Sequence, residues 1–449
     1  MPEKCTQIIH WLQDDNQRKA FSRVWSISWP MTMIMLFEFL ISLADVYIAG
    51  KVGKEIQASY GFVTQLYFVF TVIGNAFTVG TVSVISRLCP SIGSKEYAGA
   101  VFSSIMTTVG TGVVLGVAGI ILSPVILRFL NIPPELKQFG IPLITIYAGG
   151  IIFHYLLINT NGLLRACKGV MSSLKTMAFV CLVNIGLNFL FVFYTPLGFR
   201  GIALSTAVSV LLGAIINLVH LKAIFWHNRC FYWRIVRKVF QIGWPSGLLQ
   251  VIWQLGSTII FLILSALPAN NVEIIAAFTN GYRLESVIFL PAFAFNMANA
   301  VVVGNLLGED NKEDAFRNGI FTAVLGVLLV GVTTLIILVN AAYLVAFLST
   351  NQIVIHYSIK YLLICLPFEP FMAWGVILGG GLNGAGDTRS VMVVVALSIW
   401  FVRIPFSYLL GVVLQLGAPG VWWAMNASIV IQAILITVWY FKRRWLENA

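Results

Sequence analysis

The sequence is poor in charged residues, which make up only 10% of its 449 positions. Soluble domains carry about 25%, so this chain has too few charges to cover a water-facing surface. Hydrophobic residues make up 59% of the chain, and its mean hydropathy is +0.90. The composition excludes an ordinary water-soluble globular domain and indicates a protein that lies in the membrane.

The sequence also lacks the motifs of hydrolytic, nucleotide-driven and metal chemistry. It has no Walker A loop, no HExxH motif and no nucleophile paired with a base, so we expect neither an enzyme nor an ATP-driven pump. Its six cysteines have no CxxC or framework spacing, which predicts no disulfide, no metal centre and no cofactor. The first 24 residues lack the apolar core and cleavage site of a signal peptide.

Twelve continuous apolar stretches are present, each near or above the ~20 residues that a helix needs to cross a bilayer. They do not alternate in polarity, as the strands of a membrane barrel would. The sequence therefore predicts an all-α integral membrane protein with 12 transmembrane helices. The expected helices occupy residues 25–49, 58–84, 98–130, 138–164, 173–194, 201–226, 241–267, 272–306, 316–349, 355–384, 390–415 and 419–441.

Basic residues are distributed unevenly between the two sides of these helices. Of the 28 Lys and Arg, 20 lie at the two termini and the connections on one side, and six lie on the other. By the positive-inside rule the richer side faces the cytoplasm. This predicts a multi-pass plasma (inner) membrane protein with both termini cytoplasmic. The net charge of +11 is explained by topology, so we expect no nucleic acid among the partners.

The two halves of the chain repeat each other. Trp29-Pro30 recurs 215 positions later as Trp244-Pro245, and Leu197-Gly198 recurs 219 positions later as Leu416-Gly417. Six helices per half is an even number, so both halves insert in the same orientation, and such parallel repeats place a substrate site at their interface. The expected domains are a cytoplasmic lead (1–24), an N-lobe (25–226), a basic cytoplasmic linker (227–240), a C-lobe (241–441) and a cytoplasmic C-terminus (442–449).

Several motifs occur in an order that is typical of one transporter family. They are Trp29-Pro30, Asp45, residues 49–53, residues 304–308, residues 382–388 and Arg403-Ile404-Pro405. With this set at these helix positions, the chain resembles the multidrug and toxic compound extrusion (MATE) transporters over nearly its whole length. The resemblance implies two six-helix lobes in a V shape, and export of amphipathic organic cations driven by Na⁺ or H⁺.

Acidic residues within the apolar stretches are functional candidates, because an acid at the centre of a membrane helix costs about 2.5–3.5 kcal/mol on insertion scales. Glu38 and Asp45 are seven positions apart, which places them within about 20° of one helix face. Neutral oxygens near them can complete a site for a hard monovalent cation. The candidate ion-coupling residues are Asp45, Glu38, Asn184, Asn188, Thr206 and Asn161.

The resemblance implies particular roles for some of these residues. Asp45 matches the helix 1 acid that MATE transporters use for ion coupling, and Asn184 and Thr206 match its partners, which together with Asn188 make a candidate Na⁺ site. Asn188 stands where several bacterial relatives have Asp. Glu38 stands where relatives often have a neutral residue, so it has two interpretations: an ion-coupling acid, or a substrate-contacting or structural residue.

The second half carries different polar residues. Asp45 is matched there by Ile260, and the helix 7 acid that the resemblance implies for Na⁺ binding in this lobe is missing. Aromatic faces attract organic cations and methionine adapts to varied shapes. The expected substrate-cleft residues are Gln250, Gln254, Glu285, Glu369, Trp253 and Met31. For the two glutamates, substrate binding and a buried ion pair with Arg403 both remain open.

The sequence thus predicts a monomeric cation-coupled (Na⁺ or H⁺) antiporter that exports amphipathic organic cations or drugs across the lipid bilayer by alternating access. We expect the N-terminal half to bind the coupling ion and the C-terminal half mainly to shape the substrate cleft. The alternative is a flippase of a lipid-linked intermediate, which would need a strongly cationic cavity. Four intramembrane acids against Arg283 and Arg403 favour cationic cargo.

Overall fold

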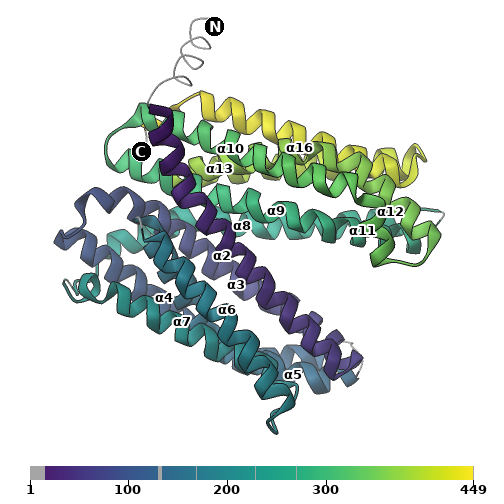
Figure 1. Cartoon of the computed structure of the whole chain (residues 1–449), viewed down its shortest axis with the longest axis horizontal. Helices are drawn as coiled ribbons and strands as arrows, with labels where there is room; N and C mark the ends of the chain where they lie inside the picture. The colour runs from purple at the N-terminus through teal and green to yellow at the C-terminus, as the bar shows by residue number, and fades with distance from the viewer. Residues whose placement is uncertain (1–15, 130–133, 168, 228, 269, 448–449) are drawn as a thin grey trace, which may run out of the picture. The chain divides into compact units, whose positions relative to one another are not determined.

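The computed structural model describes residues 16–129, 134–167, 169–227, 229–268 and 270–447 (Figure 1). This part of the chain is almost entirely helical and contains 12 helices that are long and apolar enough to cross a membrane. The prediction of an all-α membrane protein with 12 spanning helices is confirmed.

The first six spans are continuous helices, as their unbroken apolar stretches predict. They are α2 (Asn16–Val52), α3 (Lys54–Leu88), α4 (Lys95–Phe129), α5 (Pro134–Ala166), α6 (Val170–Phe193) and α7 (Arg200–His227), with a short 3₁₀ turn, η1 (Cys89–Ser91), after α3. Helix α5 packs against α3, α4 and α7. Small residues allow the close approach: a Cβ built on Gly112 of α4 would lie 2.8 Å from the Cα of Ile152 of α5.

The last six spans include several interrupted helices. Four are continuous: α8 (Trp233–Ser265), α9 (Asn271–Gly308), α10 (Lys312–Val339) and α16 (Gly417–Phe441). The other segments are α11 (Ala341–Leu348), α12 (Gln352–Cys365), η2 (Leu366–Phe368), α13 (Glu369–Gly384), α14 (Thr388–Leu397), η3 (Ser398–Arg403), α15 (Ile404–Tyr408), η4 (Leu409–Val413) and the terminal α17 (Arg444–Glu447).

Prolines account for two of the interruptions. Pro367 lies in the 3₁₀ turn between α12 and α13, and Pro405 follows the π-helical segment η3. Proline cannot donate the backbone hydrogen bond of a regular helix, so the helix is irregular around each of these residues. Glu369 is the first residue of α13, and Arg403 is the last of η3. Both charged residues therefore lie at helix irregularities, which are frequent at functional sites.

The chain divides into two compact units, Met33–Gly247 and the combination of Met1–Thr32 with Leu248–Ala449. Both boundaries fall inside a helix, α2 or α8, so they differ from the lobe limits expected from the sequence, which stay a prediction. Helix α8 also begins at Trp233, so the second half of the expected linker is helical. At Asn340 the expected helix 316–349 is divided into α10 and α11.

The internal repeat is visible in the backbone. Gly198 and Gly417, which occupy equivalent positions before α7 and within the start of α16, both have positive φ angles, 53° and 64°. Glycine adopts this left-handed conformation without the steric cost that a Cβ brings. Each half therefore has a glycine in the left-handed conformation where its sixth span begins.

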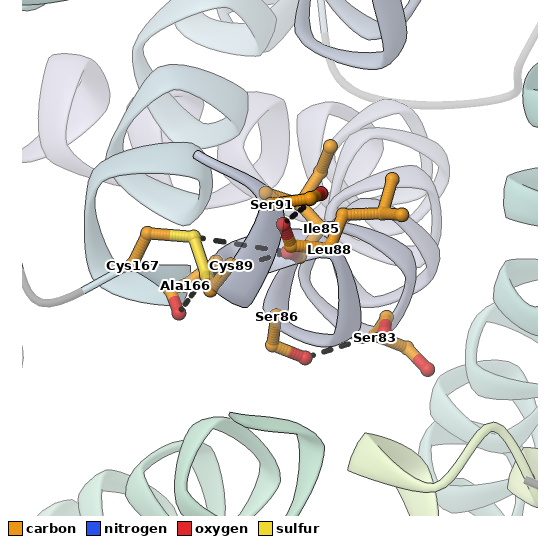
Figure 2. Close-up of a disulfide and its surroundings, with 8 residues drawn as sticks. All are labelled: Ser83, Ile85, Ser86, Leu88, Cys89, Ser91, Ala166 and Cys167. Carbon is orange, nitrogen blue, oxygen red and sulfur yellow. Dashed lines mark hydrogen bonds between the residues drawn. A yellow bond between two sulfur atoms is a disulfide. The ribbon is translucent and has the colours of Figure 1, made fainter. Parts of the chain in front are cut away.

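The expectation of no disulfide is wrong, because Cys89 and Cys167 are bonded (Figure 2). Cys89 directly follows α3 and Cys167 directly follows α5, and 78 positions separate them. No sequence spacing reveals this pair, since packing of α3 against α5 brings their carboxyl ends together. Among the cysteines that the structure describes, Cys181 and Cys365 are free and buried.

Candidate ion-coupling and substrate sites

Asp45 of α2 is buried, with 3% of its surface exposed, and its carboxylate accepts hydrogen bonds from three helices. The Asn188 side-chain amide donates to Oδ1 at 2.6 Å. The hydroxyls of Tyr60 and Thr206 donate to Oδ2 at 3.3 and 3.2 Å. The Asn184 amide in turn donates to the Thr206 hydroxyl at 3.2 Å. The structure therefore brings together Asp45, Asn184, Asn188 and Thr206, as the sequence predicts.

Helix geometry explains why these residues meet. Asn184 and Asn188 are four positions apart on α6, so they project from one face of that helix. Asp45 lies eight positions before Gly53, the residue that separates α2 from α3, and Tyr60 lies seven positions after it. Because the two helices form a hairpin, these residues reach the same depth.

Two side-chain oxygens of the residues around Asp45 have no hydrogen-bond donor among the described residues. They are the side-chain carbonyl oxygens of Asn184 and Asn188, both fully buried. A buried polar atom without a partner costs about 1–3 kcal/mol. The amide nitrogens of these two residues face Asp45 and Thr206, so the oxygens join the carboxylate and the Thr206 hydroxyl around a hard monovalent cation only when the amides rotate. An Asn side chain can also exchange its donor and acceptor ends by rotating.

The other two candidate ion-coupling residues do not contact Asp45. Asn161 belongs to a separate polar network, in which its side-chain oxygen accepts hydrogen bonds from Ser173 and Asn217, each at 2.9 Å. Glu38 has an exposed side chain and lies within electrostatic range of the buried Arg165. Neither side chain is among the described hydrogen-bond partners of Asp45, so their part in ion coupling stays a prediction.

The second half has a buried cluster of two carboxylates and one guanidinium, whereas the site in the first half has one carboxylate with neutral partners. Tyr361 donates a hydrogen bond of 2.8 Å to Glu285. Arg403 donates to the Ser428 hydroxyl at 2.9 Å and lies over the Trp253 ring, 5.3 Å from its centroid. Glu369 lies within electrostatic range of both Glu285 and Arg403.

These groups surround a hollow of about 40 Å³, which is room for a water molecule or a small ion. One Glu369 oxygen is buried without a hydrogen-bond partner in the described part of the chain. Of the expected substrate-cleft residues, Trp253, Glu285 and Glu369 line this hollow. Gln250 is half-buried and Gln254 exposed, whereas Met31 is buried with 1% exposure. These three residues do not line the hollow.

Sequence reasoning missed the two tyrosines that bond the buried acids. Tyr60 had a usable signal, since its distance from the turn at Gly53 matches that of Asp45. Tyr361 had none, because it reaches Glu285 across 76 positions and two different spans. The disulfide was missed for the same reason.

Comparison with known proteins agrees with this fold. A family model described as MatE matches residues 30–190 and 245–409, two segments that begin 215 positions apart. The probable multidrug resistance protein NorM of Thermotoga maritima is 23% identical over 426 residues, covering 92% of this chain and 90% of that protein. The probable multidrug resistance protein YpnP of Bacillus subtilis is 25% identical over 415 residues, covering 91% of each.

Solved structures give the same result for the fold. The outward-facing conformation of a multidrug resistance MATE family transporter of the MOP superfamily superposes with a TM-score of 0.88, at 18% identity, over 96% of this chain and 97% of that one. The resemblance drawn from the sequence motifs is confirmed. The chain belongs to the MATE family, whose members are membrane transporters and not enzymes.

Proposed function

We propose that this protein is a cation-coupled antiporter that exports amphipathic organic cations or drugs by alternating access. The observation that carries the proposal is the buried Asp45 carboxylate with its neutral oxygen partners on α6 and α7. Family membership supports transport and multidrug efflux, and the relatives are named for multidrug resistance. The flippase alternative is not favoured by these relatives.

The Asp45 site supports coupling because an ion there changes the charge of a buried group. Without a cation, Asp45 is an anion held by three hydrogen-bond donors. If Na⁺ is the coupling ion, it is held by the Asp45 carboxylate, the side-chain oxygens of the two Asn residues and the Thr206 hydroxyl. If H⁺ is the coupling ion, it binds to the Asp45 carboxylate alone. A ligand shifts an access equilibrium only through its different affinity for the two states, and moving a population from 1:99 to 99:1 takes about 5.5 kcal/mol.

The cluster around Glu285 supports a cationic substrate. Its two carboxylates exceed the single guanidinium of Arg403, and the hollow is also lined by aromatic rings such as Tyr282 and Phe289. Acidic and aromatic groups together attract organic cations. In this proposal the Arg403 guanidinium partly neutralises the acids, and an organic cation takes its place beside Glu369 only in an access state in which the hollow is larger than its present volume of about 40 Å³.

The charge distribution supports an orientation with both termini in the cytoplasm and a location in the plasma (inner) membrane. Along the chain, the α3–α4 connection follows the second span, the α7–α8 connection follows the sixth, and Lys442 and Arg443 follow the twelfth. An even number of spans separates these basic segments, which supports one common side for them under the positive-inside rule. We further propose that the protein works as a monomer.

The test is transport by purified protein in liposomes loaded with ethidium, with an inward Na⁺ gradient or an inward proton gradient applied separately. Wild type should expel ethidium under one gradient, and that result identifies the coupling ion. Asp45→Asn should abolish coupled efflux while the protein keeps its helical circular dichroism. Glu55→Gln, which removes an exposed acid paired with Lys54, is the matched control and should transport normally. Wild-type efflux by Asp45→Asn would overturn the proposal.

A further inference from the structure

An apolar hollow is lined by residues of α3, of α4 and around the start of α8, and it shares no lining residue with the hollow beside Glu285. Its volume is about 520 Å³, and it lies within the unit Met33–Gly247. Ile73 of α3 and the stretch of α4 from Met106 to Leu115 line its length, and Phe231 and Trp233 line one end. Gly110 in its wall has nothing within 4 Å of a built Cβ, so the space is open at that point.

The aromatic end of the hollow is fixed in place. The backbone N–H of Tyr232 donates a hydrogen bond of 2.7 Å to the hydroxyl of Ser103, which is fully buried on α4. The neighbouring rings of Phe231 and Trp233 have centroids 6.5 Å apart, and 69% of Trp233 is exposed. Exposed aromatic rings of this kind are typical of the level where lipid headgroups meet acyl chains.

Basic side chains follow directly after this aromatic segment. Arg234 and Lys238 are exposed and stand four positions apart on α8, so they share one face of the helix. Lys238 lies within electrostatic range of both Arg234 and Arg87, which is near the end of α3. Three cations in so small a region attract an anion strongly.

The distance between the basic residues and the hollow is comparable to the distance from a phospholipid headgroup into its acyl chains. Ile73 precedes Arg87 by fourteen positions on α3, which is about 21 Å at 1.5 Å per residue. The hydrocarbon core of a bilayer is about 30 Å thick, so Ile73 lies within that core, at the depth of acyl chains, when Arg87 lies at the headgroup level. Basic pockets between membrane helices on the cytoplasmic side bind anionic headgroups.

We propose that this hollow and its basic rim bind one anionic phospholipid, with an acyl chain along α4 and the phosphate beside Arg234 and Lys238. The apolar lining of the hollow suits an acyl chain. The positive charge of Arg234 and Lys238 favours an anionic over a zwitterionic headgroup. Assignment to the cytoplasmic leaflet rests on the orientation given under the proposed function, whereas binding itself does not depend on it.

The test is native mass spectrometry of the purified, delipidated full-length protein titrated with phosphatidylglycerol or phosphatidylcholine of identical acyl chains. Wild type should bind phosphatidylglycerol more tightly. The double variant Arg234→Gln/Lys238→Gln should lose this preference by roughly thirtyfold, or five- to sixfold per basic residue. The control Lys175→Gln/Lys222→Gln, which removes two exposed charges of α6 and α7, should keep it.

A second pair of variants tests the hollow itself. Gly110→Leu fills open space and should weaken binding of both lipids. Gly186→Leu is the matched control, since Gly186 of α6 is also exposed and also has nothing within 4 Å of a built Cβ. Equal binding of the two lipids by wild type, an unchanged preference in the double variant, or unchanged binding by Gly110→Leu would each overturn the proposal. Asp45→Asn should bind lipid normally, so failure of the transport proposal is distinguished from failure of this one.

Discussion

Replacing Tyr60 with Phe removes one of the three hydrogen-bond donors to the Asp45 carboxylate and leaves the ring in place. The Tyr60 hydroxyl lies 3.3 Å from Oδ2, and the residue has 5% of its surface exposed. This donor stabilises the unloaded, anionic carboxylate. Its loss should therefore raise the affinity of the site for the coupling cation, because the unloaded form is weakened more than the loaded form.

The magnitude follows from the geometry. Hydrogen bonds to charged groups contribute about 1.5–3 kcal/mol, and 3.3 Å is longer than the usual 2.5–3.0 Å for two oxygens. The lower end, about 1.5 kcal/mol, corresponds to about a tenfold change in the dissociation constant. The coupling-cation concentration for half-maximal ethidium efflux should fall about tenfold, and the maximal rate should fall because the ion is released more slowly.

The assay is ethidium efflux from proteoliposomes over a range of coupling-cation concentrations. Tyr343→Phe is the control, since Tyr343 of α11 is 75% exposed. A half-maximal concentration that rises in Tyr60→Phe would refute the reasoning, because it would make the tyrosine oxygen a ligand of the ion and not a donor to the empty site.

Two further predictions concern the scaffold. A Cβ at Gly380 of α13 would collide with a backbone carbonyl of α9, whereas Gly331 of α10 has nothing within 4 Å. Gly380→Ala should therefore lower the thermal unfolding midpoint. Gly331→Ala should leave the midpoint unchanged or raise it slightly, because alanine adds up to about 1 kcal/mol of helix propensity. Equal midpoints for the two variants would contradict this packing. Reduction of the Cys89–Cys167 disulfide should destabilise the protein by about 2–4 kcal/mol. The measurement is the thermal unfolding midpoint, which should be lower with reductant than without it. If reductant lowers the midpoint of Cys89→Ser by the same amount, the disulfide is not the cause of the effect.

The sequence by itself determined the membrane class, the helix count and the repeat. Each depends on local properties: a run of about 20 apolar residues is long enough to cross a bilayer wherever it occurs, and motifs at a near-constant offset are read directly from the chain. The sequence also found Asp45, Asn184, Asn188 and Thr206, because polar groups are so unfavourable in apolar spans that each one stands out.

Only the tertiary structure decided which of these polar groups meet. In the structure, the Asn161 side chain accepts hydrogen bonds from Ser173 and Asn217 and is not a described partner of Asp45. The structure also added Tyr60 as a donor and joined Cys89 to Cys167. The physical reason is that a helix shows its own faces through its periodicity, whereas the rotation and depth at which two helices pack depend on the side chains of both.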